Sequence, residues 1–314
     1  KATLEEYGCG SCGPRGFYGT VMPHIYIEND MAKFMGTEAG ISYSDTDSTV
    51  SSTIPAFAKR GDLIVVDKQV HEALQVGVEL SRAWVKTYAH NDMISLENVL
   101  KEVVAEDKRV HRDVTKQRRF IVTEGLFRNT GTIADLKALV ALKKRFGFRL
   151  ILDESLSFGC LGKSGKGLTE ALGIPVEEVD ILIVSMAFSL ASAGGMCLGN
   201  VEVVDHQRLS GAGYCFSASA PPFTSSAACE ALRVLQREPE LIKTLTQNID
   251  ALVTGINKIP HLKVVSDKKS PIIFIALDDN TISTFDEQSK RLELIVERCR
   301  AANVLVTQSV ILKG

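Results

Sequence analysis

A carboxylate follows a predicted strand at the place where parallel sheets bind ligands. Phe148–Leu152 has the pattern of a buried strand, and Asp153 comes directly after it, ahead of a glycine-rich loop. Ligands of α/β sheets bind at the carboxyl ends of strands. Asp153 could therefore carry a catalytic charge or pair with a cofactor's pyridinium nitrogen, or it could only cap the loop. The residues alone leave these readings open.

Three further polar residues, in two segments of the chain, have the same ambiguity. His71 lies just beyond the aliphatic run Leu63–Val66, where it could act as a catalyst or be a hydrogen-bonded histidine of the core. Ser217 and Ser219 precede a Pro-Pro pair that opens a helical pattern. Their hydroxyls and the nearby amides suit a phosphate, but plain helix capping would use the same residue types.

A loop near the start of the chain concentrates glycine. Tyr7–Gly16 contains four glycines, so the backbone must turn sharply or approach another group closely. Cys9 and Cys12 have the spacing of a redox pair or of half a zinc site, but no second such pair and no suitable histidine pair occurs. We therefore expect no metal site.

Short aliphatic runs that alternate with helical spacing predict the sheet that must position these residues. The runs are Leu63–Val66, Phe120–Val122, Leu150–Leu152 and Ile181–Val184. This alternation indicates an α/β fold with a mostly parallel sheet flanked by helices. The clearest helix runs from about Asp135 to Phe146, with Gly147 as its stop.

The remaining patterns predict a second, smaller part. Helical spacing occurs at about Phe223–Arg237, 241–259 and Glu287–Ala302, and Ile272–Leu277 has a strand pattern. We expect two domains, a large one over residues 1–240 and a partial α+β lobe over residues 241–314. The two domains together fit the chain's length.

The composition and one long uncharged stretch bear on three other classes of protein: nucleic-acid binders, disulfide scaffolds and membrane proteins. The chain has 36 Lys and Arg against 38 Asp and Glu, which argues against a cationic nucleic-acid binder. Its seven scattered cysteines predict reduced thiols rather than a disulfide scaffold. The stretch Ile181–Val201 carries no charge, but its serines, its Asn200 and its Gly194-Gly195 pair favour a buried strand and a turn over a membrane helix.

The order of these segments resembles that of the α-oxoamine synthases over essentially the whole chain. The matching segments are Tyr7–Gly16, His71, His90–Asp92, Val122–Gly125, Asp153–Gly159, Asp180–Gly195 and Ser217–Pro222. Members of this family are fold-type I pyridoxal-phosphate enzymes that condense an amino acid with an acyl-CoA. The resemblance implies that fold and a dimer whose sites lie at the subunit interface.

The sequence departs from the family where the cofactor would be held. Phe188 occupies the position of the Schiff-base lysine, and a phenyl ring cannot form an aldimine. Leu156 replaces a family histidine, and Thr46-Asp47 stands where the phosphate-binding turn prefers Gly-Tyr. A carboxylate at that turn would repel a phosphate dianion. We therefore expect no catalytic residue in this chain.

The matching positions imply roles for eight side chains. Ser217 and Ser219 would reach the phosphate bound in the opposite subunit, as the corresponding hydroxyls of the family do. His71, Asp153 and Ser185 would form a remnant of the cofactor pocket at the ring, the pyridine nitrogen and the phosphate. Three more residues match positions near the shared interface, namely Cys12, Arg15 and Tyr43.

These losses resemble those of family subunits that lack the Schiff-base lysine. Such a subunit pairs with a lysine-bearing catalytic subunit that holds pyridoxal phosphate covalently. The complex joins L-serine to palmitoyl-CoA, which yields 3-ketodihydrosphingosine in the first step of sphingolipid biosynthesis. The resemblance also implies an endoplasmic-reticulum membrane location, with the catalytic domain facing the cytosol and the anchor in a segment that this chain lacks.

Two other functions stay open at this point. The chain could be a self-sufficient pyridoxal-phosphate enzyme that dispenses with the usual lysine. It could instead be a scaffolding or regulatory subunit that only stabilises its partner. Ser217 and Ser219 distinguish these hypotheses, since a pure scaffold would contribute no atoms to the partner's site.

Overall fold

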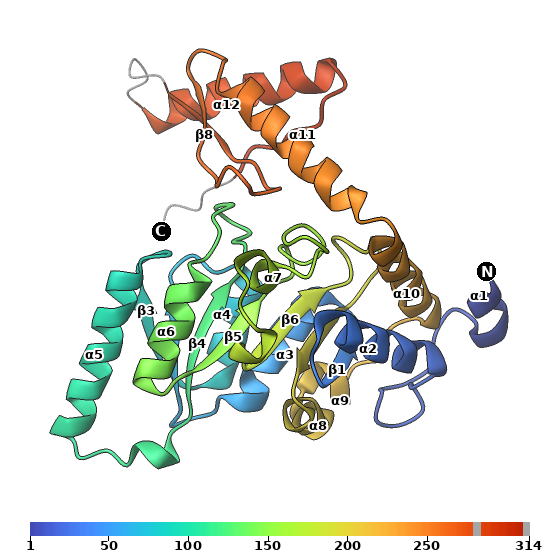
Figure 1. The fold of residues 1–314 in the computed structure, drawn as a ribbon, viewed down its shortest axis with the longest axis vertical. Coiled ribbons are helices and arrows are strands. Elements are labelled where there is room, and N and C mark those ends of the chain that lie inside the picture. Colours follow the sequence, from blue (N-terminus) through green and yellow to red (C-terminus); the bar gives the residue numbers. More distant parts are fainter. Residues whose placement is uncertain (279–283, 310–314) are drawn as a thin grey trace.

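A central sheet organises the larger part of the chain (Figure 1). The structure is a computed structural model that describes residues 1–278 and 284–309. In these residues, seven strands form a sheet in the order β1-β7-β6-β5-β4-β2-β3. Their bounds are β1 (Ala39–Tyr43), β2 (Leu63–Asp67), β3 (Trp84–Tyr88), β4 (Arg119–Glu124), β5 (Arg149–Asp153), β6 (Ile181–Ser185) and β7 (Gly195–Gly199).

The sheet is mostly parallel, as predicted. Strands β3, β2, β4, β5 and β6 run parallel, whereas β7 is antiparallel to both β6 and β1. Every residue of β2, β4 and β6 is buried, which explains the continuous aliphatic runs in their sequences. The four predicted strands are all confirmed.

Helices cover the sheet and connect its strands. They are α1 (Ala2–Tyr7), α2 (Met22–Met35), α3 (Thr46–Phe57), α4 (Glu72–Ser81), α5 (Met93–Arg109), α6 (Leu136–Phe146), α7 (Leu168–Leu172), α8 (Val201–Ser210), α9 (Ala212–Cys215) and α10 (Pro222–Arg237), with short 3₁₀ turns at Val114–Lys116 and Val176–Glu178. Helix α6 matches its prediction closely. The Asp135 side chain accepts from the amide of Ala138, and Gly147 ends the helix in the left-handed conformation.

The uncharged stretch Ile181–Val201 contains two strands and a loop. Strand β6 leads through residues 186–194 into β7, so the prediction of a buried strand followed by a turn is confirmed. In residues 1–278 and 284–309, no helix combines the length and the apolar character that crossing a membrane requires.

A smaller group of elements follows α10. Helix α11 (Glu240–Ile256) extends away from the sheet towards a strand pair, β8 (Leu262–Val264) and β9 (Ile275–Leu277), and helix α12 (Phe285–Ala301) (Figure 1). The predicted boundary at residue 240 coincides with the start of α11, and the division into two domains stays a prediction. The predicted lobe also includes residues 279–283 and 310–314, which lie outside the described residues.

The strand predicted at Ile272–Leu277 was too long. Strand β9 begins only at Ile275. The amides of Ile272 and Phe274 donate to the hydroxyls of Ser270 and Ser266 instead of to a neighbouring strand. These local hydrogen bonds compete with the sheet and delay its start.

Candidate functional site

The carboxyl ends of parallel strands bring His71 and Asp153 together. Asp153 ends β5, and His71 follows β2 as the residue that precedes helix α4. The His71 Nε2 atom lies 2.7 Å from the Asp153 Oδ2 atom, and both side chains are buried. The other Asp153 oxygen accepts from the amide of Ser155, so Asp153 also caps its loop, the simpler of the two interpretations of this residue.

The two groups stabilise each other's charge. Burial by itself lowers the pKa of His71, but the hydrogen bond and the negative charge of Asp153 outweigh it and raise that pKa. Burial likewise opposes ionisation of Asp153, yet the same partner holds the pKa of the carboxyl below its usual value. The two side chains therefore form a buried pair in which each group favours the charged form of the other.

A second carboxylate completes this cluster. Glu124 ends β4 between the two other strands and accepts hydrogen bonds from the amides of His71 and Arg128, each at 2.8 Å. Burial raises the pKa of Glu124 to about 7, against the favourable charge of His71. Glu124 is hence poised to change its charge near neutral pH. Its place at a strand end, like that of Asp153, was the sequence signal that could have identified it.

The space beside this cluster is closed. Its lining includes His71, Glu124, Asp153, Ser155 and Leu156, and its cavity volume is about 0 Å³. Within the described part of the chain, the buried His71 Nδ1 and Ser155 Oγ atoms have no hydrogen-bond partner. An aromatic ring cannot enter without moving these side chains.

The predicted phosphate end of the remnant pocket is also occupied by the chain's own groups. The hydroxyl of Ser185, at the end of β6, lies 2.7 Å from the hydroxyl of Thr46, which in turn donates to the carbonyl oxygen of Gly194. Beside them, Asp47 lies 3.3 Å from the guanidinium of Arg128. Ser185 is thus engaged within the chain, and a carboxylate stands nearby.

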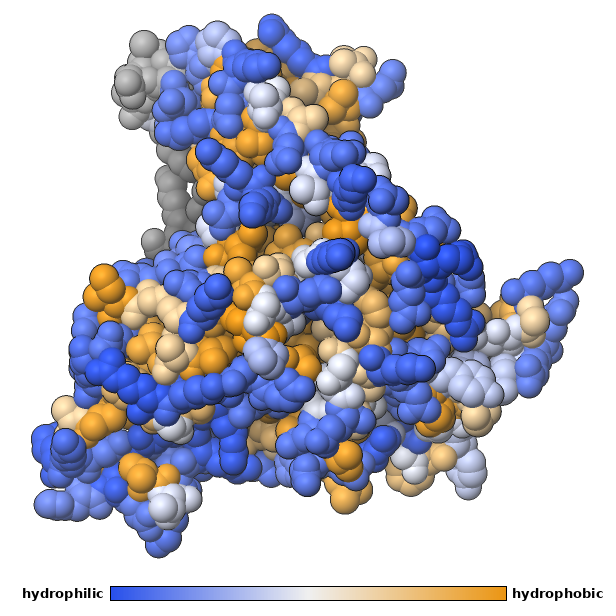
Figure 2. All heavy atoms as spheres, in the orientation of Figure 1, coloured by the Kyte–Doolittle hydropathy of each residue, from blue (hydrophilic) through white to orange (hydrophobic). Residues whose placement is uncertain are grey.

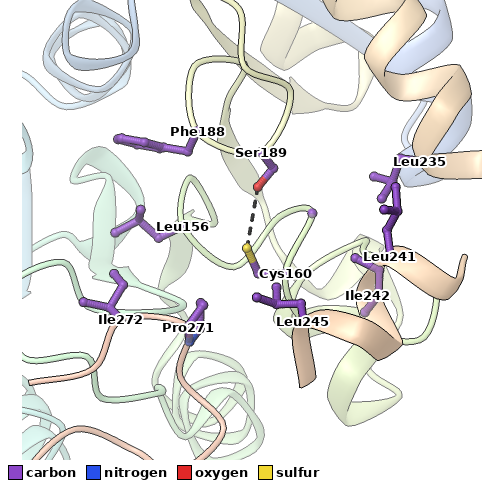
Figure 3. Close-up of a pocket in the computed structure, with 11 residues that line it drawn as sticks. Leu156, Cys160, Phe188, Ser189, Leu235, Leu241, Ile242, Leu245, Pro271 and Ile272 are labelled. Atoms are coloured by element: carbon purple, nitrogen blue, oxygen red, sulfur yellow. Dashed lines mark hydrogen bonds between the residues drawn. The ribbon is translucent and has the colours of Figure 1, made fainter. Parts of the chain in front are cut away.

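Phe188 lies in the loop between β6 and β7. Its side chain is 47% exposed, and the guanidinium of Arg128 packs 5.5 Å from the centre of its ring. Phe188 also borders an open apolar pocket of about 400 Å³ (Figure 3). Sequence reasoning missed Arg128, because a lone arginine in a loop carries no distinctive pattern.

These observations test whether pyridoxal phosphate fits this chain's own site. The closed cavity leaves no room for its ring, Asp153 already pairs with His71, and Phe188 offers no amine. At the predicted phosphate end, the Ser185 hydroxyl already bonds to Thr46, and the carboxylate of Asp47 pairs with Arg128. The residues therefore do not fit the cofactor.

Ser219 is tied to the glycine-rich loop. Its amide donates to the carbonyl oxygen of Gly13, and its hydroxyl donates to that of Gly19 at 2.5 Å. Ser217 is less engaged, since its closest hydroxyl neighbour is Ser44 at 3.5 Å. Helix α10 has no side-chain cap at its start, so the alternative that these serines cap the helix is wrong. Ser219 supports the glycine-rich loop instead.

The three predicted interface residues differ in exposure. Cys12 is exposed, with a positive φ of 58°. Arg15 is buried and pairs with Glu28 at 2.6 Å, and the buried hydroxyl of Tyr43 donates to Gln207. An interface role for the latter two stays a prediction, and it would have to act through the backbone that they fix.

The thiols of Cys9 and Cys12 are both free and exposed. Among the described residues, no group of three or more His, Cys, Asp or Glu side chains could hold a metal ion. Directly after the glycine-rich loop, Phe17 and Tyr18 are 76% and 90% exposed. Phe216, close to the serines that the loop contacts, is 86% exposed.

Comparisons with known proteins identify the family. The family model described as aminotransferase class I and II matches residues 1–310. Long chain base biosynthesis protein 1b of Oryza sativa is 46% identical over 94% of this chain, and serine palmitoyltransferase 1 of Dictyostelium discoideum is 41% identical over 98%. The chain spans 60% and 64% of the length of these two relatives.

Solved structures agree with the fold. Serine palmitoyltransferase of Sphingomonas wittichii has a TM-score of 0.86 and 27% identity, over 99% of this chain and 73% of that one. The enzyme of S. paucimobilis, solved with a pyridoxal phosphate–myriocin aldimine, has a TM-score of 0.85 and 25% identity, over 98% of this chain and 74% of that one. The resemblance to subunit 1 of serine palmitoyltransferase and the predicted fold-type I α/β architecture are confirmed. The chain belongs to the class I and II aminotransferase family.

Proposed function

We propose that this chain is a non-catalytic but required subunit of a serine palmitoyltransferase. The complex would condense L-serine with palmitoyl-CoA to 3-ketodihydrosphingosine, in the first step of sphingolipid long-chain base biosynthesis. The names of the relatives support this reaction. Two features support the non-catalytic role: Phe188 matches the family's lysine position and has no amine, and the space beside His71 and Asp153 is closed.

A lysine-bearing partner subunit would hold the cofactor. When bound there, pyridoxal phosphate supplies the electron sink for carbon–carbon bond formation. This chain would present to that site the loop that carries Ser217, because the hydroxyl of Ser219 is already used within the chain. Ser217 would donate a hydrogen bond to the partner's phosphate, and Ser219 would hold the loop in place.

The surface around this loop supports a partner of the same fold. Phe17, Tyr18 and Phe216 are large apolar side chains left in solvent, and such patches commonly mark protein interfaces. The loops that carry them are joined by the hydrogen bonds of Ser219 to Gly13 and Gly19. Association would bury these rings and bring Cys12 close to the partner. We also assign the complex to the endoplasmic-reticulum membrane, facing the cytosol, which fractionation of tagged protein would test.

Coexpression tests the proposal. The chain and a lysine-bearing homologue are purified alone and together and are supplied with L-serine and palmitoyl-CoA. We expect product only from the complex. Product from this chain alone would overturn the proposal, since it would make the chain a self-sufficient enzyme.

A second measurement separates catalytic support from scaffolding. Ser217→Ala should weaken the binding of pyridoxal phosphate to the complex, while Ser226→Ala on helix α10 serves as a control. A scaffold that contributes no atoms to the site would give the same cofactor affinity in both variants.

A further inference from the structure

The pocket beside Phe188 is built from apolar walls. Leu235, Leu241, Ile242 and Leu245 line it from the end of α10 and the start of α11, and Leu156 and Phe188 lie opposite (Figure 3). On the face shown in Figure 2, apolar side chains gather where these helices approach the body that holds the sheet. Its volume of about 400 Å³ falls in the range of about 300–1,000 Å³ that small-molecule sites occupy.

The polar atoms of the pocket are already satisfied. The Ser189 hydroxyl donates to the carbonyl oxygen of Phe158 at 2.6 Å and lies 3.6 Å from the Cys160 sulfur. Burial raises the pKa of the Cys160 thiol, which keeps it neutral. No side chain of the lining carries a charge. A polar or charged ligand would lose its hydration here and gain no hydrogen bond in return.

The pocket is also kept open by a fixed backbone. Gly159 has a positive φ of 73°, and a β-carbon on it would overlap the side chain of Ser189. The loop of Phe158–Gly159 and the loop of Phe188–Ser189 are therefore in direct contact and hold one wall in place. Such preorganised walls favour binding, because little side-chain freedom is lost when a ligand enters.

We infer that this pocket binds one long saturated alkyl chain, with the polar head of the ligand left outside in solvent. The inference rests on the proposed function in so far as both the acyl thioester and the long-chain base carry such a chain. Burial of methylene groups against the leucine side chains supplies the binding free energy. This subunit thus has a ligand site of its own, which shares only Leu156 with the closed space beside His71.

Displacement of a fluorescent long-chain fatty acid, cis-parinaric acid, from the purified chain tests this site. We expect saturable binding that palmitate or sphinganine displaces and octanoate does not. Whichever head group displaces the probe at lower concentration identifies the source of the alkyl chain. Failure of both long-chain competitors would overturn the inference.

Two tryptophan substitutions on α11 locate the site. Leu245→Trp fills the pocket and should weaken probe binding at least about tenfold. Leu252→Trp adds the same ring to an exposed position of the same helix outside the pocket lining and should leave the affinity within about twofold. Equal affinities in the two variants would contradict the inference.

The outcome is independent of the catalytic assay. Turnover by the complex without probe binding would remove the alkyl site and leave the proposed function intact. Probe binding without turnover would support the alkyl site and contradict the proposed function. Loss of probe binding when the partner subunit is added would mean that protein covers the pocket, and it would overturn the inference.

Discussion

The His71 Nε2 atom lies 2.7 Å from the Asp153 Oδ2 atom, so the two side chains that the sequence assigns to a cofactor pocket bind each other. The carboxylate of Asp153 therefore already has a hydrogen-bond partner and does not need a cofactor's pyridinium nitrogen as one. Glu124, which accepts from the His71 amide, fixes the histidine backbone beside them. All three side chains are buried and belong to the protein core.

Replacing Asp153 with Asn should destabilise the fold by about 1–3 kcal/mol at neutral pH, because the buried charge-assisted hydrogen bond to His71 is lost. The pKa of His71 should fall below its ordinary value, since burial then dominates. Urea unfolding and the NMR titration of His71 measure both effects. As a control, Asp205→Asn removes an exposed carboxylate and should change stability by less than about 0.5 kcal/mol. Equal losses in the two variants would contradict the buried ion pair.

Stability should decrease as pH rises through the range set by Glu124. Its pKa of about 7 in the folded state lies above the ordinary glutamate value of 4.5, so the folded state is favoured while the group is protonated. The contribution is fully present below pH 4.5 and is lost as pH rises to about 7, a change of about 3 kcal/mol. The raised pKa of His71 acts in the same direction above pH 6.5. Glu124→Gln should remove most of the slope between pH 4.5 and 7, and an unchanged slope would exclude Glu124 as its source.

Phe188→Lys should not restore a cofactor site. The new amine would approach the guanidinium of Arg128, and the space beside His71 and Asp153 would still have no room for the ring. We therefore expect no imine absorbance band and no added mass after borohydride reduction in the presence of pyridoxal phosphate. A stoichiometric reduced adduct on residue 188 would show that the pocket opens more easily than its packing indicates.

Four strands of the sheet could be predicted from the sequence because each contains a short aliphatic run that is buried. The aliphatic runs in β2, β4, β5 and β6 are each continuous, and Asp135 and Gly147 delimit α6. The strand β9 was predicted less well, since hydroxyls of nearby serines compete for its amides. Such local competition is not visible in hydrophobic periodicity.

The candidate site could be predicted only in part. The strand-end rule and the family resemblance located His71 and Asp153, but neither indicated that they bind each other across 82 residues of chain. The neighbouring Glu154 shows why residue type is insufficient. It accepts from the amides of Leu168 and Thr169, so this buried carboxylate supports the start of α7. Only the three-dimensional arrangement shows that Asp153 pairs with His71 whereas Glu154 supports a helix.

Two glycines of the same loop should respond differently to alanine. A β-carbon on Gly19 would overlap the carbonyl oxygen of Gly13 and approach the Ser219 hydroxyl, whereas one on Gly16 would meet nothing within 4 Å. Gly19→Ala should thus displace the loop and reduce assembly with the partner at least about tenfold, and Gly16→Ala should bind normally. Sedimentation of the mixed subunits measures both. Normal assembly by Gly19→Ala would contradict the prediction that the conformation of this loop controls assembly.

Cys12→Trp should separate folding from assembly. Because Cys12 is exposed in the single chain, a bulky ring there has room, and the free energy of unfolding should change by less than about 1 kcal/mol. In the complex the same position would lie against the partner, where overpacking costs on the order of 1–3 kcal/mol. Turnover should then fall by about 5- to 150-fold at equal protein concentrations. Cys9→Trp, at the other exposed thiol of the loop, tests whether the effect is specific to position 12. Unchanged turnover with normal assembly in Cys12→Trp would remove Cys12 from the interface.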